Sequence, residues 1–163
     1  MKKRDIFVTS SANQTRKLGE VLAKGLNGGQ IICLTGELGS GKTTFAQGIL
    51  RGLGAKGPYT SPTFVVMKQY KIKNQKSKIK ITNQKLKIGN VYHIDAYRVG
   101  AQDILVLGWK EIVTGKNNVV IVEWAEKIKN IIPKGAVWVK FEYIKDNNRK
   151  VIFNSKIKNK NAK

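Results

Sequence analysis

The chain has 163 residues, a length that suits one domain large enough to bury a hydrophobic core. Its 31 Lys and Arg against 10 Asp and Glu give a formal net charge of +21, and no apolar run approaches the roughly 20 residues that a membrane span needs. The first residues lead into a strand-like segment and not into the apolar core of a signal peptide, so we expect a soluble, cytoplasmic protein.

The positive charge is concentrated in two stretches of the chain. Residues 71–87 carry 7 Lys and no acid, and residues 145–163 carry 7 basic residues against one acid, Asp146. Aromatic side chains, on which the bases of a single strand would stack, are sparse in both stretches. The pattern favours solvated lysine-rich segments, and a contribution to RNA affinity is the alternative interpretation.

The N-terminal part of the chain predicts a strand followed by a helix. Residues 6–9 are typical of a short strand. Ser11 with Gln14 three residues later matches a capping box, so a helix should begin there and end at the Asn-Gly-Gly of residues 27–29. The start of this helix is a candidate for contact with a nucleotide base, although scaffolding is the more common role. Its apolar positions recur at helical spacing, at Leu18, Val21, Leu22 and Leu26.

A buried strand and an amphipathic helix come next. Residues 30–35 form a continuous apolar run, which is typical of a strand covered on both faces in an α/β sheet. Residues 43–53 place apolar side chains on one stripe of a helix. Cys33, the only cysteine, lies in the apolar run, so it is predicted to be a buried small hydrophobic residue in a reducing compartment.

The junction between that strand and that helix matches G-x-x-x-x-G-K-[ST] at Gly36, Gly41, Lys42 and Thr43. The glycines let backbone N–H groups converge on phosphate oxygens, next to the partially positive N-terminus of the helix. Lys42 would reach the β- and γ-phosphates, and the Thr43 hydroxyl would bind Mg²⁺. The alternative, a glycine-rich turn, is disfavoured because a strand before the motif and a helix after it are both predicted. The expected phosphate-binding residues are Gly36, Glu37, Leu38, Gly39, Ser40, Gly41, Lys42, Thr43 and Thr44.

Residues 57–63 interrupt regular structure, because two prolines restrict the backbone and push the preceding residues out of helix. The segment carries three hydroxyl side chains, Thr60, Ser61 and Thr63. A hydroxyl-rich loop shortly after a P-loop helix is where switch segments sense the γ-phosphate, and an ordinary turn is the alternative. Residues 64–70 are predicted to resume as a strand.

Residues 71–90 stand apart in composition. The triplet N-Q-K occurs twice, and lysine alternates with isoleucine or leucine. Period-2 alternation suits an extended hairpin with one apolar face, and low complexity equally suits a mobile insertion. The segment is predicted to be an insertion, and its form stays open between these two alternatives.

Two further predicted strands each end in an acid. Residues 91–95 end in Asp95, and the apolar run 119–123 ends in Glu123. Mg²⁺ prefers hard oxygen ligands, so carboxylates at strand ends near a P-loop are candidates for a metal site. A buried unpaired Glu is costly unless it faces a cation or water, which makes Glu123 the stronger metal candidate. For Asp95 the alternative is a cap on the following turn.

His93 and Trp124 lie beside these acids in the sequence. By alternation, His93, the only histidine, lies on the same strand face as Asp95. A structural role is favoured for it, and a zinc site is rejected because no Cys or second His is nearby. Trp124 is a candidate to stack on a base or contact a partner, while core packing is the more common role of such an aromatic residue.

The C-terminal part of the chain predicts, in order, short helices at 101–109 and 125–131 and strands at 137–144 and 150–154. The two strands should form a hairpin around the turn at residues 146–148. Residues 155–163 are typical of a frayed basic tail. Since no internal boundary is visible, residues 1–154 are predicted to form one P-loop ATPase domain.

The motifs, taken in this order, closely resemble those of the TsaE family, the small bacterial P-loop ATPases of the threonylcarbamoyladenosine tRNA-modification pathway. They are GELGSGKTTF at residues 36–45, TSPTF at 60–64, YHIDAYR at 92–98, LGW at 107–109 and VEWA at 122–125. The resemblance runs from the first helix to the C-terminal hairpin, and the combination is far more specific than the P-loop alone.

The resemblance implies an α/β, P-loop NTPase-like three-layer fold with a mixed parallel and antiparallel sheet and a C-terminal hairpin. It also implies weak hydrolysis of ATP that resets a complex of TsaD and TsaB homologues. That complex transfers the threonylcarbamoyl group, so this chain would meet tRNA only through it. Carried over by position, Lys42 and the loop amides hold the phosphates, Thr43 and Glu123 bind Mg²⁺, and Asp95 is the Walker-B-like acid. Lys42, Asp95 and Glu123 are therefore the expected catalytic residues, with Ser61 and Thr63 in the switch-like segment.

The chain departs from the family pattern in two segments, and two other classes of P-loop protein are alternatives for its function. The Lys-rich stretch 71–90 and the basic tail are longer than the family pattern leads us to expect, so contact of the insertion with TsaD, with RNA or with neither stays open. A small-molecule or nucleoside kinase shares the P-loop, but it needs an acceptor pocket and usually an arginine-bearing lid, for which Arg51 and Arg98 are the only central arginines. A GTPase is disfavoured because no [NT]-K-x-D motif occurs.

Overall fold

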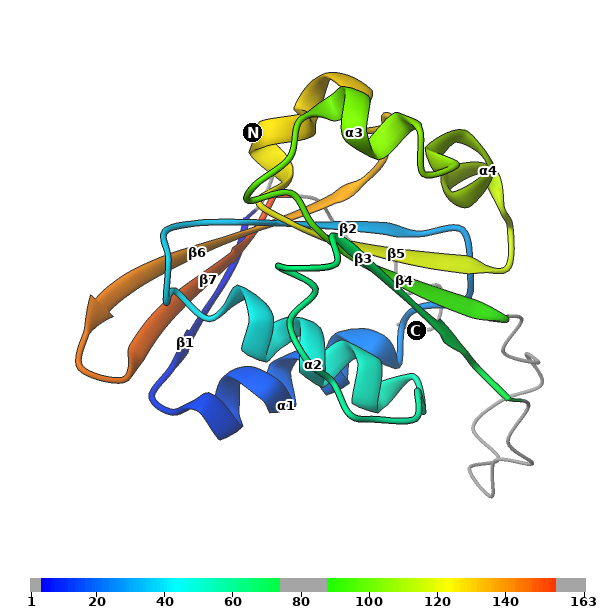
Figure 1. Ribbon diagram of the computed structural model, residues 1–163. Coiled ribbons are helices and arrows are strands. Elements are labelled where there is room, and N and C mark those ends of the chain that lie inside the picture. Colours follow the sequence, from blue (N-terminus) through cyan, green and yellow to red (C-terminus); the bar gives the residue numbers. More distant parts are fainter. Residues whose placement is uncertain (1–3, 74–87, 155–163) are drawn as a thin grey trace.

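The computed structural model describes residues 4–73 and 88–154, which form one seven-stranded sheet in the order β1-β7-β6-β2-β5-β4-β3 (Figure 1). Strand β2 pairs in parallel with β5 and β6, and β4 pairs in parallel with β5. The remaining pairs, β1 with β7, β6 with β7 and β3 with β4, are antiparallel. The strands are β1 (Asp5–Thr9), β2 (Ile31–Thr35), β3 (Met67–Lys71), β4 (Asn90–Asp95), β5 (Asn118–Glu123), β6 (Val137–Lys145) and β7 (Asn148–Phe153).

Helices cover both faces of this sheet. One face carries α1 (Ala12–Ala23) and α2 (Lys42–Gly52), and the other carries α3 (Ala101–Leu105), α4 (Trp109–Thr114) and the 3₁₀ helix η1 (Ala125–Ile131) (Figure 1). The predicted α/β three-layer fold with a mixed sheet and a C-terminal β6–β7 hairpin is confirmed. Among the described helices, none combines the length and the apolar character that a membrane crossing requires.

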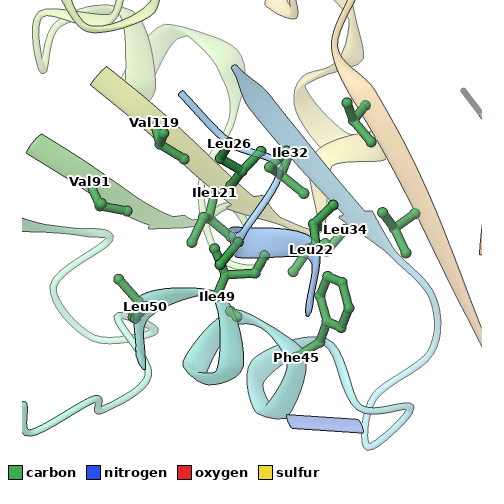
Figure 2. Close-up of a cluster of buried hydrophobic side chains, with 14 of the residues drawn as sticks. Leu22, Leu26, Ile32, Leu34, Phe45, Ile49, Leu50, Val91, Val119 and Ile121 are labelled. Atoms are coloured by element: carbon green, nitrogen blue, oxygen red, sulfur yellow. The ribbon is translucent and has the colours of Figure 1, made fainter. Parts of the chain in front are cut away.

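The central strands are buried on both sides, as their unbroken apolar sequences predict. Alternate residues of β2 face opposite cores: Ile32 and Leu34 join the cluster under α1 and α2, while Cys33 joins the cluster under α4 and η1. Figure 2 shows the first cluster, with side chains of β2, β4 and β5 meeting those of α1 and α2. Full burial of each large aliphatic side chain contributes roughly 1.5–3 kcal/mol. Burial also raises the pKa of the Cys33 thiol to about 12, in keeping with its predicted role as a small hydrophobic residue.

Two glycines let α1 and α2 pack at close range. A Cβ atom on Gly19 of α1 would lie 2.3 Å from the Phe45 carbonyl oxygen, and one on Gly48 of α2 would lie 2.0 Å from the Arg16 carbonyl oxygen. Since real Cβ atoms do not approach this closely, the backbones touch only because both positions lack a side chain. This contact fixes the start of α1 relative to the start of α2.

Apart from shifts of one or two residues at element ends, the predicted elements differ from the structure in four places. Helix α1 ends at Ala23 and not at residues 27–29, because the N–H groups of residues 24–26 make turn hydrogen bonds three residues back in place of helical ones. The strand predicted from residue 64 begins only at Met67, because a turn after Pro62 continues through Val66, whose φ is 64°. The single helix predicted at 101–109 is wrong: Gly108, with φ 82°, separates α3 from α4. The Ser11 hydroxyl does accept the Gln14 N–H at 3.1 Å, but the Gln14 side chain accepts from the N–H of Ser10 in place of Ser11, at 2.8 Å.

The lysine-rich segment enters the fold between β3 and β4. Strand β3 ends at Lys71 and β4 begins at Asn90, and these two strands pair with each other in antiparallel register. The alternatives that the sequence leaves open for this segment concern residues 74–87, which lie outside the described residues, as does the predicted basic tail 155–163.

The close packing of α1 on α2 generates a stability prediction. Gly48→Ala should lower the free energy of unfolding by about 1–3 kcal/mol, because the new methyl group must displace the α1 backbone. Urea unfolding followed by circular dichroism measures the change. Gly89→Ala serves as the control, since its nearest neighbour would lie at an ordinary 3.7 Å. Equal stability of the two variants would contradict the close contact.

Candidate functional site

Three parallel strands deliver functional side chains to one edge of the sheet. Glu123, the last residue of β5, pairs in register with Leu34 of β2 on one side and with Asp95, the last residue of β4, on the other. The chain leaves β2 at this same edge and enters the loop that leads to α2 (Figure 1). Carboxyl ends of parallel strands are where α/β sheets usually bind ligands.

The loop between β2 and α2 needs its glycines for two physical reasons. Gly36, Gly39 and Gly41 have φ values of 135°, 73° and 107°, in the left-handed region that side chains disfavour. A Cβ atom on Gly36 would also lie 2.4 Å from the Phe141 carbonyl oxygen of β6. Gly41 is the N-cap of α2, so the predicted phosphate loop has the backbone form that its sequence requires.

The first turn of α2 presents unbonded backbone donors to this loop. Phe45 N–H donates to the Gly41 carbonyl at 2.9 Å, and the amides of Lys42, Thr43 and Thr44 precede that first bond. Such N–H groups, together with the helix dipole, attract anions. The geometry therefore suits a phosphate at the position where the sequence predicts one.

Lys42 is almost fully buried at the centre of the loop. Its Nζ donates to the carbonyl oxygens of Gly36 at 2.6 Å and Glu37 at 2.7 Å, and lies 4.0 Å from the centroid of the Trp124 ring. Burial lowers the pKa of the ammonium group, and the nearby carboxylates of Glu123, Glu126, Asp95 and Glu37 act in the opposite direction. The Lys42 ammonium thus hydrogen-bonds the loop and is also attracted electrostatically by the acids at the strand ends.

The Glu123 carboxylate links α2 to β4 across the sheet edge. Thr43 Oγ1 donates to Glu123 Oε2 at 2.7 Å, and His93 Nε2 lies 2.7 Å from Glu123 Oε1. The Glu123 side chain is only 2% exposed, so both oxygens depend on these partners. A carboxylate and a hydroxyl are therefore adjacent at the N-terminus of α2.

Asp95 connects the hydroxyl-rich loop to the same edge. Thr63 Oγ1 donates to Asp95 Oδ2 at 2.8 Å, and Ser61 Oγ lies 2.7 Å from Thr63 Oγ1. The Tyr97 N–H donates to Asp95 Oδ1 at 2.9 Å, so Asp95 also caps the turn that follows β4. The two interpretations of Asp95 offered by the sequence are thus compatible in one side chain.

The predicted site residues are not all brought to this centre. Thr60 hydrogen-bonds the Lys68 ammonium and does not line the cleft described below. The Leu38 side chain is 79% exposed, and Glu37 is exposed as well. Buried Ser40 donates its N–H to the Glu37 carbonyl at 3.2 Å, which braces the loop from inside.

Trp124 closes one side of the site with an aromatic pair. Its backbone has φ 57°, and its ring lies 4.8 Å from the ring of Tyr97. Lys127 Nζ lies 4.6 Å from the Tyr97 ring and 5.6 Å from the Trp124 ring. The half-buried indole also contacts the apolar cluster under η1. Trp124 therefore packs against the core and lines the cleft described below.

These groups line a cleft of about 560 Å³, a volume typical of small-molecule sites. Its far wall combines the start of α1 with the tip of the β6–β7 hairpin, where the Arg149 Nε donates to the Gly39 carbonyl at 3.2 Å. The sequence flagged the start of α1 but missed Asn147 and Arg149, because no local pattern shows that the hairpin tip returns to the loop. Beyond the start of α1, the lining residues that were not predicted as site residues are Tyr97, Arg98, Asn147 and Arg149.

The donor chemistry of the site fits Mg²⁺. Thr43, Glu123 and Asp95 offer hard oxygen atoms at the N-terminus of α2, and Mg²⁺ commonly takes one or two such protein oxygens together with phosphate oxygens and water. Thr43 and Glu123 would hold the ion, since their oxygens already lie 2.7 Å apart. The nearby Asp95 carboxylate would face its hydration shell.

Comparisons with known proteins agree in assigning one family. Residues 9–151 match the family model described as Threonylcarbamoyl adenosine biosynthesis protein TsaE. The chain is 31% identical over 145 residues to the tRNA threonylcarbamoyladenosine biosynthesis protein TsaE of Treponema pallidum, which covers 88% of this chain and 96% of that protein. It is 32% identical over 142 residues to the protein of the same name from Rickettsia conorii, covering 86% and 72% respectively. The crystal structure of YdiB from Bacillus subtilis is similar with a TM-score of 0.71 at 26% identity, covering 94% of this chain and 86% of that chain.

The bond between the hydroxyl loop and Asp95 generates the second prediction. Thr63→Val keeps the side-chain shape but leaves Asp95 Oδ2 without its donor, which should destabilise the fold by about 1.5–3 kcal/mol. Ser61→Ala, at an exposed hydroxyl whose one partner among the described residues is Thr63, should change stability by less than about 0.5 kcal/mol. Chemical denaturation of both variants measures the difference, and equal losses would mean that the Thr63–Asp95 bond does not anchor the loop.

Proposed function

Because this chain belongs to the TsaE family of tRNA threonylcarbamoyladenosine biosynthesis proteins, we propose that it binds and slowly hydrolyses Mg²⁺-ATP in the cleft at the start of α2. Binding and hydrolysis would act as a switch on a complex of TsaD and TsaB homologues, which carries out the transfer to tRNA. The observation that carries the proposal is the contact between Thr43 of the glycine loop and the buried Glu123 carboxylate.

Phosphate binding rests on the loop and on Lys42. The amides at the start of α2 and the Lys42 ammonium converge on one side of the cleft. A bound β- or γ-phosphate would replace the carbonyls of Gly36 and Glu37 as the partner of Lys42, because a charged phosphate oxygen is a stronger acceptor. The amides and the ammonium group on one side of the cleft therefore support the proposal that a polyphosphate binds there.

Hydrolysis is assigned to the acids at the strand ends. Mg²⁺, when bound, would supply positive charge that neutralises the phosphate oxygens. Thr43 and Glu123 would hold the ion, and Asp95 would orient water at the same edge. Asp95 accepts one hydrogen bond from the chain at each carboxylate oxygen, which leaves further lone pairs that could accept from water.

The switch is assigned to residues 61–63. Their hydroxyls reach the site only through Thr63 and its bond to Asp95, so a rearrangement of Asp95 around a nucleotide would shift this loop. Beside it, Phe64 and Val65 are 84% and 58% exposed, and Leu38 of the glycine loop is 79% exposed. Large exposed apolar side chains in both loops support a protein partner that contacts the cleft rim.

A nucleotide assay tests the reaction class. Incubation with labelled ATP or GTP, with and without Mg²⁺ and candidate nucleoside acceptors, should release free phosphate from ATP in a Mg²⁺-dependent manner. Transfer of the label to an acceptor would favour the kinase alternative, and a preference for GTP would contradict ATP as the substrate.

The position of Lys42 generates a binding prediction. Lys42→Ala should weaken ATP affinity by about 100-fold or more, because it removes the only buried ammonium in the described part of the cleft. Isothermal titration calorimetry measures this loss. Lys110→Ala, on the exposed side of α4, is the matched control and should bind like the wild type. An unchanged ATP affinity in Lys42→Ala would show that Lys42 does not contribute to nucleotide binding.

Glu123 generates a prediction about Mg²⁺-dependent hydrolysis and not about nucleotide affinity. Glu123→Ala should retain measurable nucleotide affinity without Mg²⁺, while Mg²⁺-dependent phosphate release falls by about 100-fold. Glu111→Ala, an exposed acid on α4, controls for the loss of a negative charge. Equal hydrolysis by the wild type and Glu123→Ala would refute the metal assignment.

A further inference from the structure

His93 is a buried polar side chain that the proposed reaction does not yet use. It lies on β4, is 1% exposed, and places its Nε2 2.7 Å from Glu123 Oε1. Among the described residues its other ring nitrogen, Nδ1, has no hydrogen-bond partner. The one hydrogen-bond partner that the described residues give this ring is the carboxylate proposed as a metal ligand.

This arrangement fixes the position of the proton on the ring. The Glu123 carboxylate can only accept, so His93 Nε2 must carry the hydrogen that joins them. A hydrogen on Nδ1 would be a buried donor without an acceptor, which is costly. The tautomer with its hydrogen on Nε2 donates to Glu123 Oε1 and leaves only the Nδ1 lone pair without a partner among the described residues.

The bond to His93 also decides which way the carboxylate faces. With Oε1 held by His93, Oε2 is the oxygen that meets Thr43 Oγ1 at the start of α2. Without that donor, Oε1 would be left unpaired in a buried site, and rotation of the carboxylate would be less restricted. The direction in which Oε2 points therefore depends on His93, which contacts the other oxygen of the same carboxylate.

We propose that His93 is a positioning residue that aims Glu123 Oε2 at Thr43 and at the Mg²⁺ that the two would hold. The inference rests on the proposed function, because it assigns to Glu123 the role of metal ligand. His93 does not line the cleft, so it would act only through Glu123.

The single histidine makes a direct test of the bond possible. In ¹⁵N-labelled wild-type protein without nucleotide, a long-range ¹H–¹⁵N spectrum contains the ring signals of one histidine. We expect Nε2 to carry a proton, and Glu123→Ala to shift that signal. A spectrum in which Nε2 carries no proton overturns the proposal, whether or not the protein hydrolyses ATP.

Two substitutions separate positioning from packing. His93→Gln keeps an N–H donor of similar reach, so it should retain the Mg²⁺ dependence and kcat within about threefold. His93→Leu keeps bulk but removes the donor, so it should raise the Mg²⁺ concentration for half-maximal rate and lower kcat by about 10–100-fold. Nucleotide affinity in EDTA should stay at the wild-type value in both variants. Tyr70→Phe, which removes a buried hydroxyl that has no hydrogen-bond partner among the described residues, is the control and should change neither quantity.

The outcomes distinguish this inference from the proposed function. Absence of Mg²⁺-dependent hydrolysis in the wild type sinks the proposed function, while the imidazole spectrum still decides the bond. Wild-type behaviour of His93→Leu, or equal losses in His93→Gln and His93→Leu, overturns the positioning role. If His93→Leu does not fold, the spectrum and His93→Gln decide the question, since a loss in His93→Gln as large as that in Glu123→Ala contradicts donor positioning.

Discussion

The Glu123 carboxylate is taken out of water at the end of β5, and its two oxygens are satisfied by a hydroxyl from α2 and an imidazole from β4. A buried carboxylate without partners would be costly, so the start of α2, the end of β4 and the end of β5 must keep their relative positions. The close packing of α1 on α2 and the parallel register of β4 with β5 make this possible. The relative positions of these three elements therefore depend on the same Glu123 carboxylate that lies in the candidate site.

The second acid extends this connection to a loop. Asp95 lies beside Glu123 in register and accepts from Thr63, so residues 61–63 are attached to the same sheet edge as the glycine loop. A change in the hydrogen-bond partners of Asp95 would therefore reach the exposed Ser61 through two hydrogen bonds, Asp95–Thr63 and Thr63–Ser61. Exposed Phe64 directly follows this loop, and exposed Leu38 lies in the glycine loop, so large apolar side chains are exposed in or beside both loops at the cleft.

Local sequence patterns were sufficient for the buried strands and for the strand ends, because burial on both faces and the glycine loop leave unambiguous signatures, whereas the three-layer arrangement came from the family resemblance. Thr43, Asp95 and Glu123 could be assigned to one edge for that reason. Other features depend on tertiary contacts. Gly108 splits a segment that has the composition of one helix, and Pro62 begins a turn that delays β3 to Met67. Arg149 reaches Gly39 only through the bend of the β6–β7 hairpin. The partnership of His93 with Glu123 was detectable in principle, since aligning the two acid-ended strands in parallel places His93 diagonally opposite Glu123.

The claim at the centre of this account is that the cleft couples ATP turnover to tRNA modification by partner proteins. The most direct measurement is multiple-turnover threonylcarbamoylation of tRNA by TsaD and TsaB homologues, with this chain or its Lys42→Ala variant and with saturating donor. The account predicts sustained modification with the wild-type chain and ATP, and arrest after roughly one turnover per complex with the variant or without ATP. Equal multiple-turnover rates in all of these reactions would contradict it.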